Sequence, residues 1–149
     1  MKKLILFMLV LSLAAIFLIG CSKTEEIRYE YKGESENWTA IYIVNSIYTI
    51  KKVDNKNKYD GKKSTILTLT YKGDISELSK KKHLQYSFKS IDESGSSEVV
   101  FDVPTKKKVF THKSQSGDIN TLEMADEAIA VRVDLDGAIE TFDLMITKE

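Results

Sequence analysis

Alternating apolar and polar residues fill most of the chain after residue 26. Ile27, Tyr29 and Tyr31 alternate with charged residues, which is the two-residue period of a strand with one face toward water. Similar short runs recur along the chain, separated by stretches rich in glycine, serine, asparagine and aspartate. The pattern predicts about eight strands, at residues 27–32, 38–45, 65–71, 84–89, 99–103, 109–113, 129–135 and 138–147.

The clearest local signal is Asp136-Gly137, which stands between two alternating runs. A two-residue turn of this composition favours a β-hairpin, because both central residues must adopt a positive φ. The predicted register brings apolar residues opposite one another, pairing Leu135 with Ala138, Val131 with Phe142 and Ile129 with Leu144.

The other connections are predicted from polar composition. We expect a solvated loop at 54–63, a bulge near Ser90, a loop at 93–97 and another at 114–120, with one helical turn at 75–78. Residues 46–53 either continue the second strand or pair back as a separate one. Short strands at this spacing favour an antiparallel β-sandwich, and we expect an immunoglobulin-like one.

The first 20 residues have a different pattern. Lys2 and Lys3 precede an apolar run from Leu4 to Ile19, the composition of a signal-peptide helix. This run of 16 residues is shorter than the roughly 20 that a membrane-spanning helix needs. The predicted organisation is a signal peptide at 1–20, a tether at 21–26 and one β domain at 27–149.

Leu18-Ile19-Gly20-Cys21 resembles the lipobox of bacterial lipoproteins. The resemblance implies cleavage between Gly20 and Cys21 and a diacylglyceryl group on the Cys21 thiol. Two acyl chains hold a protein stably at a membrane, whereas a single chain does so only marginally. The implied location is therefore the extracytoplasmic face of the cell membrane, with membrane lipid as the first partner. An ordinary cleaved signal with an incidental cysteine is the alternative.

Together with the lipobox, Gly33-Glu34-Ser35-Glu36-Asn37-Trp38 and the Asp136-Gly137 turn make the chain resemble small uncharacterised lipoproteins of Gram-positive bacteria. The resemblance implies anchoring and a β-rich fold. It implies no enzymatic activity, because no chemistry is assigned to that group.

Composition disfavours several classes of function. The chain has 22 basic and 22 acidic side chains, without the basic excess of a nucleic-acid-binding protein. Acylation of Cys21, the single cysteine, would leave no thiol nucleophile and no zinc-binding thiolate. His83 and His112 are both expected on the water-facing side of a strand. We therefore expect no catalytic residues, no bound metal and no cofactor.

Two groups of residues are candidates for binding. Trp38, Tyr29, Tyr31 and Tyr42 form either an aromatic binding face or part of the core. Lysines at 51–63, 80–82 and 106–108 either face an anionic lipid or polymer or lie in solvated turns. The predicted function is a membrane-anchored binding or scaffolding module with a cell-envelope protein or anionic polymer as partner. The alternative is an immunity or inhibitor lipoprotein that protects the cell envelope.

Overall fold

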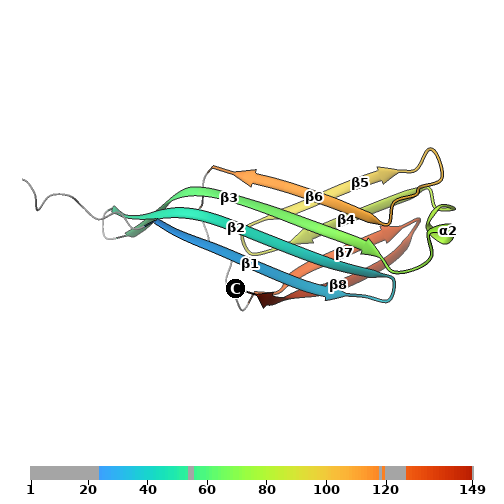
Figure 1. Cartoon of the computed structure of the whole chain (residues 1–149), viewed down its shortest axis with the longest axis horizontal. Coiled ribbons are helices and arrows are strands. Elements are labelled where there is room, and N and C mark those ends of the chain that lie inside the picture. The colour runs from blue at the N-terminus through green and yellow to red at the C-terminus, as the bar shows by residue number, and fades with distance from the viewer. Residues whose placement is uncertain (1–23, 54–55, 118, 120–126, 149) are drawn as a thin grey trace, which may run out of the picture.

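The computed structural model describes residues 24–53, 56–117, 119 and 127–148, and this part of the chain is almost entirely β-structure (Figure 1). One helical turn, α2 (Ile75–Leu78), lies between the third and fourth strands, as predicted. The strands are β1 (Thr24–Glu34), β2 (Trp38–Val53), β3 (Lys56–Tyr71), β4 (His83–Lys89), β5 (Ser94–Val100), β6 (Val109–Ser116), β7 (Ile129–Leu135) and β8 (Ala138–Lys148).

All eight strands belong to one antiparallel sheet in the order β5-β4-β7-β8-β1-β2-β3-β6. The sheet curls until it is nearly closed, so that its two edge strands, β5 and β6, face each other. The prediction of a mainly β fold with about eight antiparallel strands is confirmed. The immunoglobulin-like sandwich is not confirmed, because the two four-stranded halves are joined through β1 and β8.

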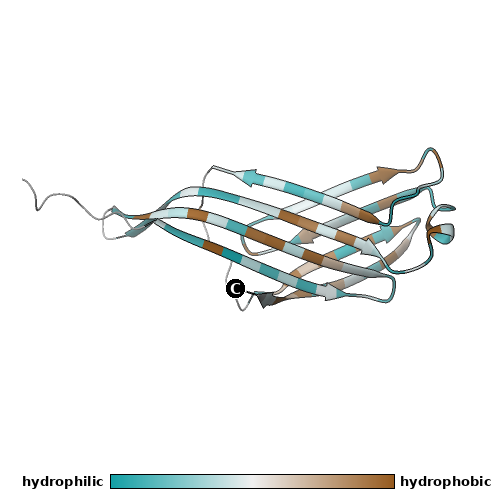
Figure 2. Ribbon diagram, in the orientation of Figure 1, coloured by the Kyte–Doolittle hydropathy of each residue, from teal (hydrophilic) through white to brown (hydrophobic). Residues whose placement is uncertain are grey.

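The strands form where the side chains alternate, and the alternation places one face of every strand in a shared core (Figure 2). Inward-facing residues of β7, for example, are almost fully buried while their neighbours are exposed. The largest fully buried side chains are Trp38, Tyr31, Tyr42, Leu67, Leu69, Leu78, Leu84, Ile129 and Leu144. Buried aromatic residues come from both halves of the sheet, for example Tyr42 of β2 and Phe88 of β4, and burial of each large apolar side chain stabilises the fold by roughly 1.5–3 kcal/mol.

The junction between β1 and β8 is short. Three residue pairs form between the described parts of these strands, and the register shifts between Glu30 and Tyr31, as at a β-bulge. Next to these pairs, a Cβ on Gly33 would lie 2.2 Å from the carbonyl oxygen of Asp143. Glycine at position 33 thus permits the backbone contact that joins the two halves.

The turn after β1 is tied to β8 by Asn37. Its backbone N–H donates to Glu140 Oε2 at 3.1 Å and its side-chain amide donates to Glu140 Oε1 at 2.9 Å. Burial would raise the pKa of Glu140, but hydrogen bonds from the turn at 35–37 outweigh it and lower that pKa. Trp38 follows at once in the core, so the stretch from Gly33 to Trp38 has a structural explanation.

The β7–β8 hairpin has the predicted turn and register. Asp136 (φ 52°) and Gly137 (φ 87°) both have positive φ, and the three predicted residue pairs all form. The Asp136 carboxylate also accepts hydrogen bonds from the backbone N–H groups of His83, at 2.7 Å, and Lys82, at 3.1 Å. The turn therefore fixes the start of β4 as well.

The predicted solvated loop at 54–63 is wrong over most of its length. Lys56–Lys62 continue β3, and β2 runs without a break through Val53, so each strand is 16 residues long. β3 pairs with β6 only from Lys63 onward. Residues 24–29 of β1, 47–53 of β2 and 56–62 of β3 consequently project beyond the rest of the sheet (Figure 1). We call this three-stranded projection the arm.

Other strand boundaries also differ from those predicted. β1 begins at Thr24, three residues earlier than expected and within the predicted tether. Residues 94–97, expected in a loop, open β5, and β6 extends to Ser116. The expected bulge near Ser90 is instead a turn that separates β4 from β5, with Ile91 63% exposed.

Candidate functional site

The seam, where β5 and β6 face each other, is the most unusual feature of the sheet. In the part of the chain that the structure describes, each of these strands pairs on one side only, β5 with β4 and β6 with β3. Among the described residues, no backbone hydrogen bond joins β5 to β6. The seam therefore presents two strand edges whose backbone groups lack a sheet partner, the kind of edge that pairs readily with another strand.

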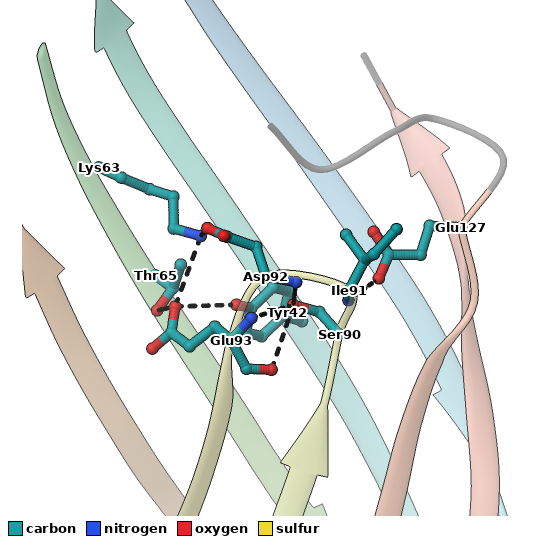
Figure 3. A network of polar contacts seen from close by, with 8 residues as sticks. All are labelled: Tyr42, Lys63, Thr65, Ser90, Ile91, Asp92, Glu93 and Glu127. Atoms are coloured by element: carbon teal, nitrogen blue, oxygen red, sulfur yellow. Dashed lines mark hydrogen bonds and ion pairs between the residues drawn. The ribbon is translucent and has the colours of Figure 1, made fainter. Parts of the chain in front are cut away.

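At the arm end, polar side chains close the seam (Figure 3). Lys63 projects from β3 into the interior, 5% exposed, and its Nζ lies 2.5 Å from Asp92 Oδ2 and 3.9 Å from Glu93 Oε2. Thr65 donates a hydrogen bond to Glu93 Oε2 at 3.0 Å, and Tyr42 donates a longer one at 3.4 Å. Asp92 and Glu93 belong to the β4–β5 turn, so this network ties one half of the sheet to the other.

The turn that carries these carboxylates is itself held by hydrogen bonds. Ser90 Oγ accepts from the backbone N–H of Glu93 at 3.0 Å, and the Ser90 N–H donates to the Glu93 carbonyl at 2.8 Å. The Ile91 N–H donates to the Glu127 carboxylate from the segment before β7. Because the turn is fixed from several sides, the carboxylates are held in place for Lys63.

In the middle of the seam, a side-chain hydrogen bond joins β5 to β6. Ser97 Oγ of β5 lies 2.9 Å from His112 Nδ1 of β6. The imidazole packs edge-on against Phe88, with ring centroids 5.4 Å apart. A Cβ on Gly95 would lie 2.8 Å from His112 Nε2, so glycine there lets β5 approach the ring. His112 faces the interior beside Leu67, and its predicted place on the water-facing side is wrong.

The Ser97–His112 pair has the spacing of a nucleophile and a base, but it lacks the third group that orients such a base. Within the described residues, no carboxylate contacts His112. The other histidine, His83, lies 2.7 Å from the exposed carboxylate of Glu98 on the outer surface. No group of three or more potential metal ligands occurs in the described part of the chain. The geometry is that of a strand-to-strand contact.

Beyond His112 the two strands separate around a groove of about 700 Å³. We call it the seam groove; it is lined by the end of β5, the connecting segment 101–107 and the start of β6. Three valines on its rim are strongly exposed: Val100 (61%), Val103 (72%) and Val109 (50%). The buried rings of Phe101 and Phe110, whose centroids lie 6.1 Å apart, form the apolar floor of the groove beneath the valines.

The groove is held in shape by backbone contacts at both ends of its connecting segment. The Phe101 N–H donates to the Lys82 carbonyl at 2.8 Å, and the Tyr71 N–H donates to the Lys108 carbonyl at 2.8 Å. Lys106 and Lys107 are exposed beside the valines. The groove thus combines apolar side chains, two strand edges and positive charge at one place.

The predicted aromatic residues lie elsewhere. Trp38 (1% exposed), Tyr31 (0%) and Tyr42 (0%) are core residues, and Tyr29 packs partly buried against them. The core alternative is the arrangement found, because rings at this depth offer no surface to a partner. Trp38 does not line the groove but supports its floor, because the centroid of its ring lies 6.2 Å from that of Phe110. Gly20 and Cys21 lie outside the described residues.

The three groups of lysines separate in space. Those at 51–62 lie on the arm, whereas those at 80–82 and 106–108 lie at the opposite end, near α2 and the seam groove (Figure 1). Lys63 differs from all of them, because it is buried and ion-paired. Sequence reasoning missed both the seam groove and the Lys63 network, since each depends on residues brought together by non-local strand pairing.

No protein-family model, curated protein or solved structure matches the chain. In the described part of the chain, no helix has the length and apolarity needed to cross a membrane.

Proposed function

We propose that the chain is a lipid-anchored binding module on the outer face of the cell membrane, which holds an extended segment of a protein partner in the seam groove. The lipobox at Leu18–Cys21 supports the anchor. The observation that carries the binding role is the seam itself, because two unpaired strand edges and three exposed valines meet there.

An extended segment suits this surface on physical grounds. Addition of a strand to an exposed edge supplies main-chain hydrogen bonds, while alternate side chains of the added strand enter neighbouring pockets. In the seam groove these alternate side chains would contact Val100 and Val109 above the Phe101 floor. Burial of an apolar side chain there contributes about 25 cal/mol per Å².

Charge complementarity narrows the class of partner. Lys106 and Lys107 flank the valines and make no ion pair among the described residues. An acidic residue next to the apolar positions of the partner would therefore gain from pairing at this rim. We infer a protein segment that alternates apolar residues and includes at least one carboxylate.

The test is site-specific photocrosslinking in cells, with the reactive amino acid placed at Val103 of the full-length chain. The matched control is Ile139, which is similarly exposed at 54% on β8. We expect a discrete adduct from position 103 and none from 139. Adding Val109→Asp should reduce the adduct at least five-fold, whereas Ile139→Asp should leave it unchanged.

Equal adducts from positions 103 and 139, or an adduct insensitive to Val109→Asp, would contradict binding in the groove. Identification of the adduct also separates the two functional classes. A toxin or lytic enzyme in the adduct would establish the immunity or inhibitor role, and another envelope protein would establish scaffolding.

A further inference from the structure

The arm carries a concentration of positive charge at the end where the described chain begins. Residues 49–60 hold four lysines and two aspartates. The four lysines, at 51, 52, 56 and 58, are all exposed. Lys51, Lys56 and Lys58 share one face of the paired strands and Lys52 lies on the other, so positive charge is held on both sides of the tip of the arm.

The arrangement of these lysines is unfavourable for the isolated domain. Lys51 and Lys58 are directly opposite each other in the β2–β3 register, and like charges in such a pair destabilise a sheet. Asp60 offsets the repulsion in part, since its carboxylate lies 2.6 Å from Lys51 Nζ and its pKa is lowered by that hydrogen bond. Lys58 also attracts the Asp60 carboxylate, whereas Lys52 and Lys56 have no ion-pair partner among the described residues.

The position of the tip relative to the anchor follows from the register. Thr24 pairs with Thr49, so residues 50–53 extend past the first described residue of β1. Four residues of strand span about 13 Å. The three residues from Cys21 to Thr24 span at most about 10 Å. The tip therefore reaches at least as far toward the membrane as an acylated Cys21 can.

We propose that the tip of the arm binds anionic lipid headgroups, and that it orients the domain with the seam groove directed away from the membrane. This inference rests on the lipid anchor proposed above. Near an anionic surface each lysine strengthens binding by up to about five-fold, and the attraction is screened by salt. With the tip on the lipid, the end that carries Lys106 and Val103 is the one open to partners.

The competing explanation assigns the lysines to protection of an edge. Residues 56–62 of β3 lie outside the pairing with β6, and lysines on an exposed strand edge discourage aggregation. That role requires no lipid, so the two explanations differ in their dependence on the membrane.

The experiment uses the full-length lipidated chain in vesicles of phosphatidylcholine, with or without about 30 mol% phosphatidylglycerol, which supplies the negative surface potential that attracts basic segments. An environment-sensitive fluorophore is attached through Asn57→Cys at the tip or through Val103→Cys at the seam groove. Acylation of Cys21 leaves the introduced thiol as the single labelling site. A quencher carried by the lipid headgroups reports contact.

We expect quenching at position 57 to rise at least two-fold with phosphatidylglycerol and to return to its lower value in high salt, with no change at 103. Lys56→Glu with Lys58→Glu should abolish the rise. Lys80→Glu with Lys82→Glu, the same charge change at the opposite end, should not.

Quenching at 57 that is indifferent to lipid charge would overturn the proposal in favour of edge protection. Equal effects of the two charge reversals would also overturn it. Failure of the anchor is distinguishable, because an unacylated chain would label at Cys21 without any introduced cysteine and would not enter the vesicles.

Discussion

The two ends of the seam differ in what lies between the two halves of the sheet. At the arm end, the buried Lys63 network fastens the β4–β5 turn to β3. At the other end, the strands separate around exposed valines and an aromatic floor. The sheet topology therefore permits an opening, while side chains decide where the opening forms.

The opening has a fixed shape because polar contacts hold the sheet around it. A network of charged and hydroxyl groups holds one end, and one hydrogen bond between Ser97 and His112 holds the middle. Between β1 and β8, hydrogen bonds from Asn37 to Glu140 fasten the turn after β1 to β8, at the end of the sheet away from the arm. Across the seam groove, no side-chain hydrogen bond or ion pair joins the two halves among the described residues.

The largest expected effect comes from breaking the closed end with Lys63→Met. The substitution leaves the carboxylates of Asp92 and Glu93 mostly buried without their cation, which costs about 3–5 kcal/mol of unfolding free energy. Denaturant unfolding measures it. Lys62→Met is the matched control, because Lys62 is exposed and surface changes stay within about 0.5 kcal/mol. Equal effects of the two substitutions would show that the network does not hold the seam.

A smaller effect is expected from Glu140→Ala, which removes the distal connection between β1 and β8. The Asn37 side-chain amide and backbone N–H then lose their acceptor, at a cost of about 1–3 kcal/mol. Urea titrations at neutral pH measure the change. A loss below about 0.5 kcal/mol would contradict the structural role of this contact.

Because of Glu140, the stability of the folded chain should also depend on pH. The pKa of Glu140 is lowered in the folded chain, so its contribution to stability is present above the pKa of the unfolded chain. That contribution is lost as pH falls through the lowered folded value. We expect Glu140→Gln to flatten the acid side of the stability curve. An unchanged acid slope would count against the assignment.

The smallest effect concerns the middle of the seam. Ser97→Ala removes the hydrogen bond to His112 and should lower the unfolding free energy by about 0.5–1.5 kcal/mol. Ser96→Ala is the control, because Ser96 is exposed on the outer side of the same strand. If both substitutions have the same effect, the Ser97–His112 contact does not contribute to closure.

Local sequence was sufficient where structure depends on local geometry. The Asp136-Gly137 turn and its register were predictable because positive φ and apolar alternation are properties of a short segment. The part of β3 that lies in the arm was not predictable in this way, because Lys56–Lys62 is polar on both faces and lacks the alternation of a half-buried strand. The serine-rich start of β5, residues 94–97, was missed for a similar reason.

Non-local pairing accounts for the other differences. Which strands would become edges depends on the order of the whole sheet, so neither the single sheet nor the seam follows from the strand pattern. In the sequence, nothing distinguishes Lys63 from the exposed lysines around it. Its burial depends on carboxylates that are 29 and 30 positions away in the chain. The candidate site therefore became visible only with the fold.

Amide hydrogen exchange on the full-length chain reports whether β5 and β6 are unpaired edges. We expect residues 94–100 and 109–116 to exchange much faster than residues 38–44 and 129–135, which lie in strands paired on both sides. Faster exchange should be most evident next to the seam groove. Protection of β5 and β6 equal to that of β2 and β7 would mean that backbone pairing closes the seam, and the seam would then offer no free strand edge to a partner.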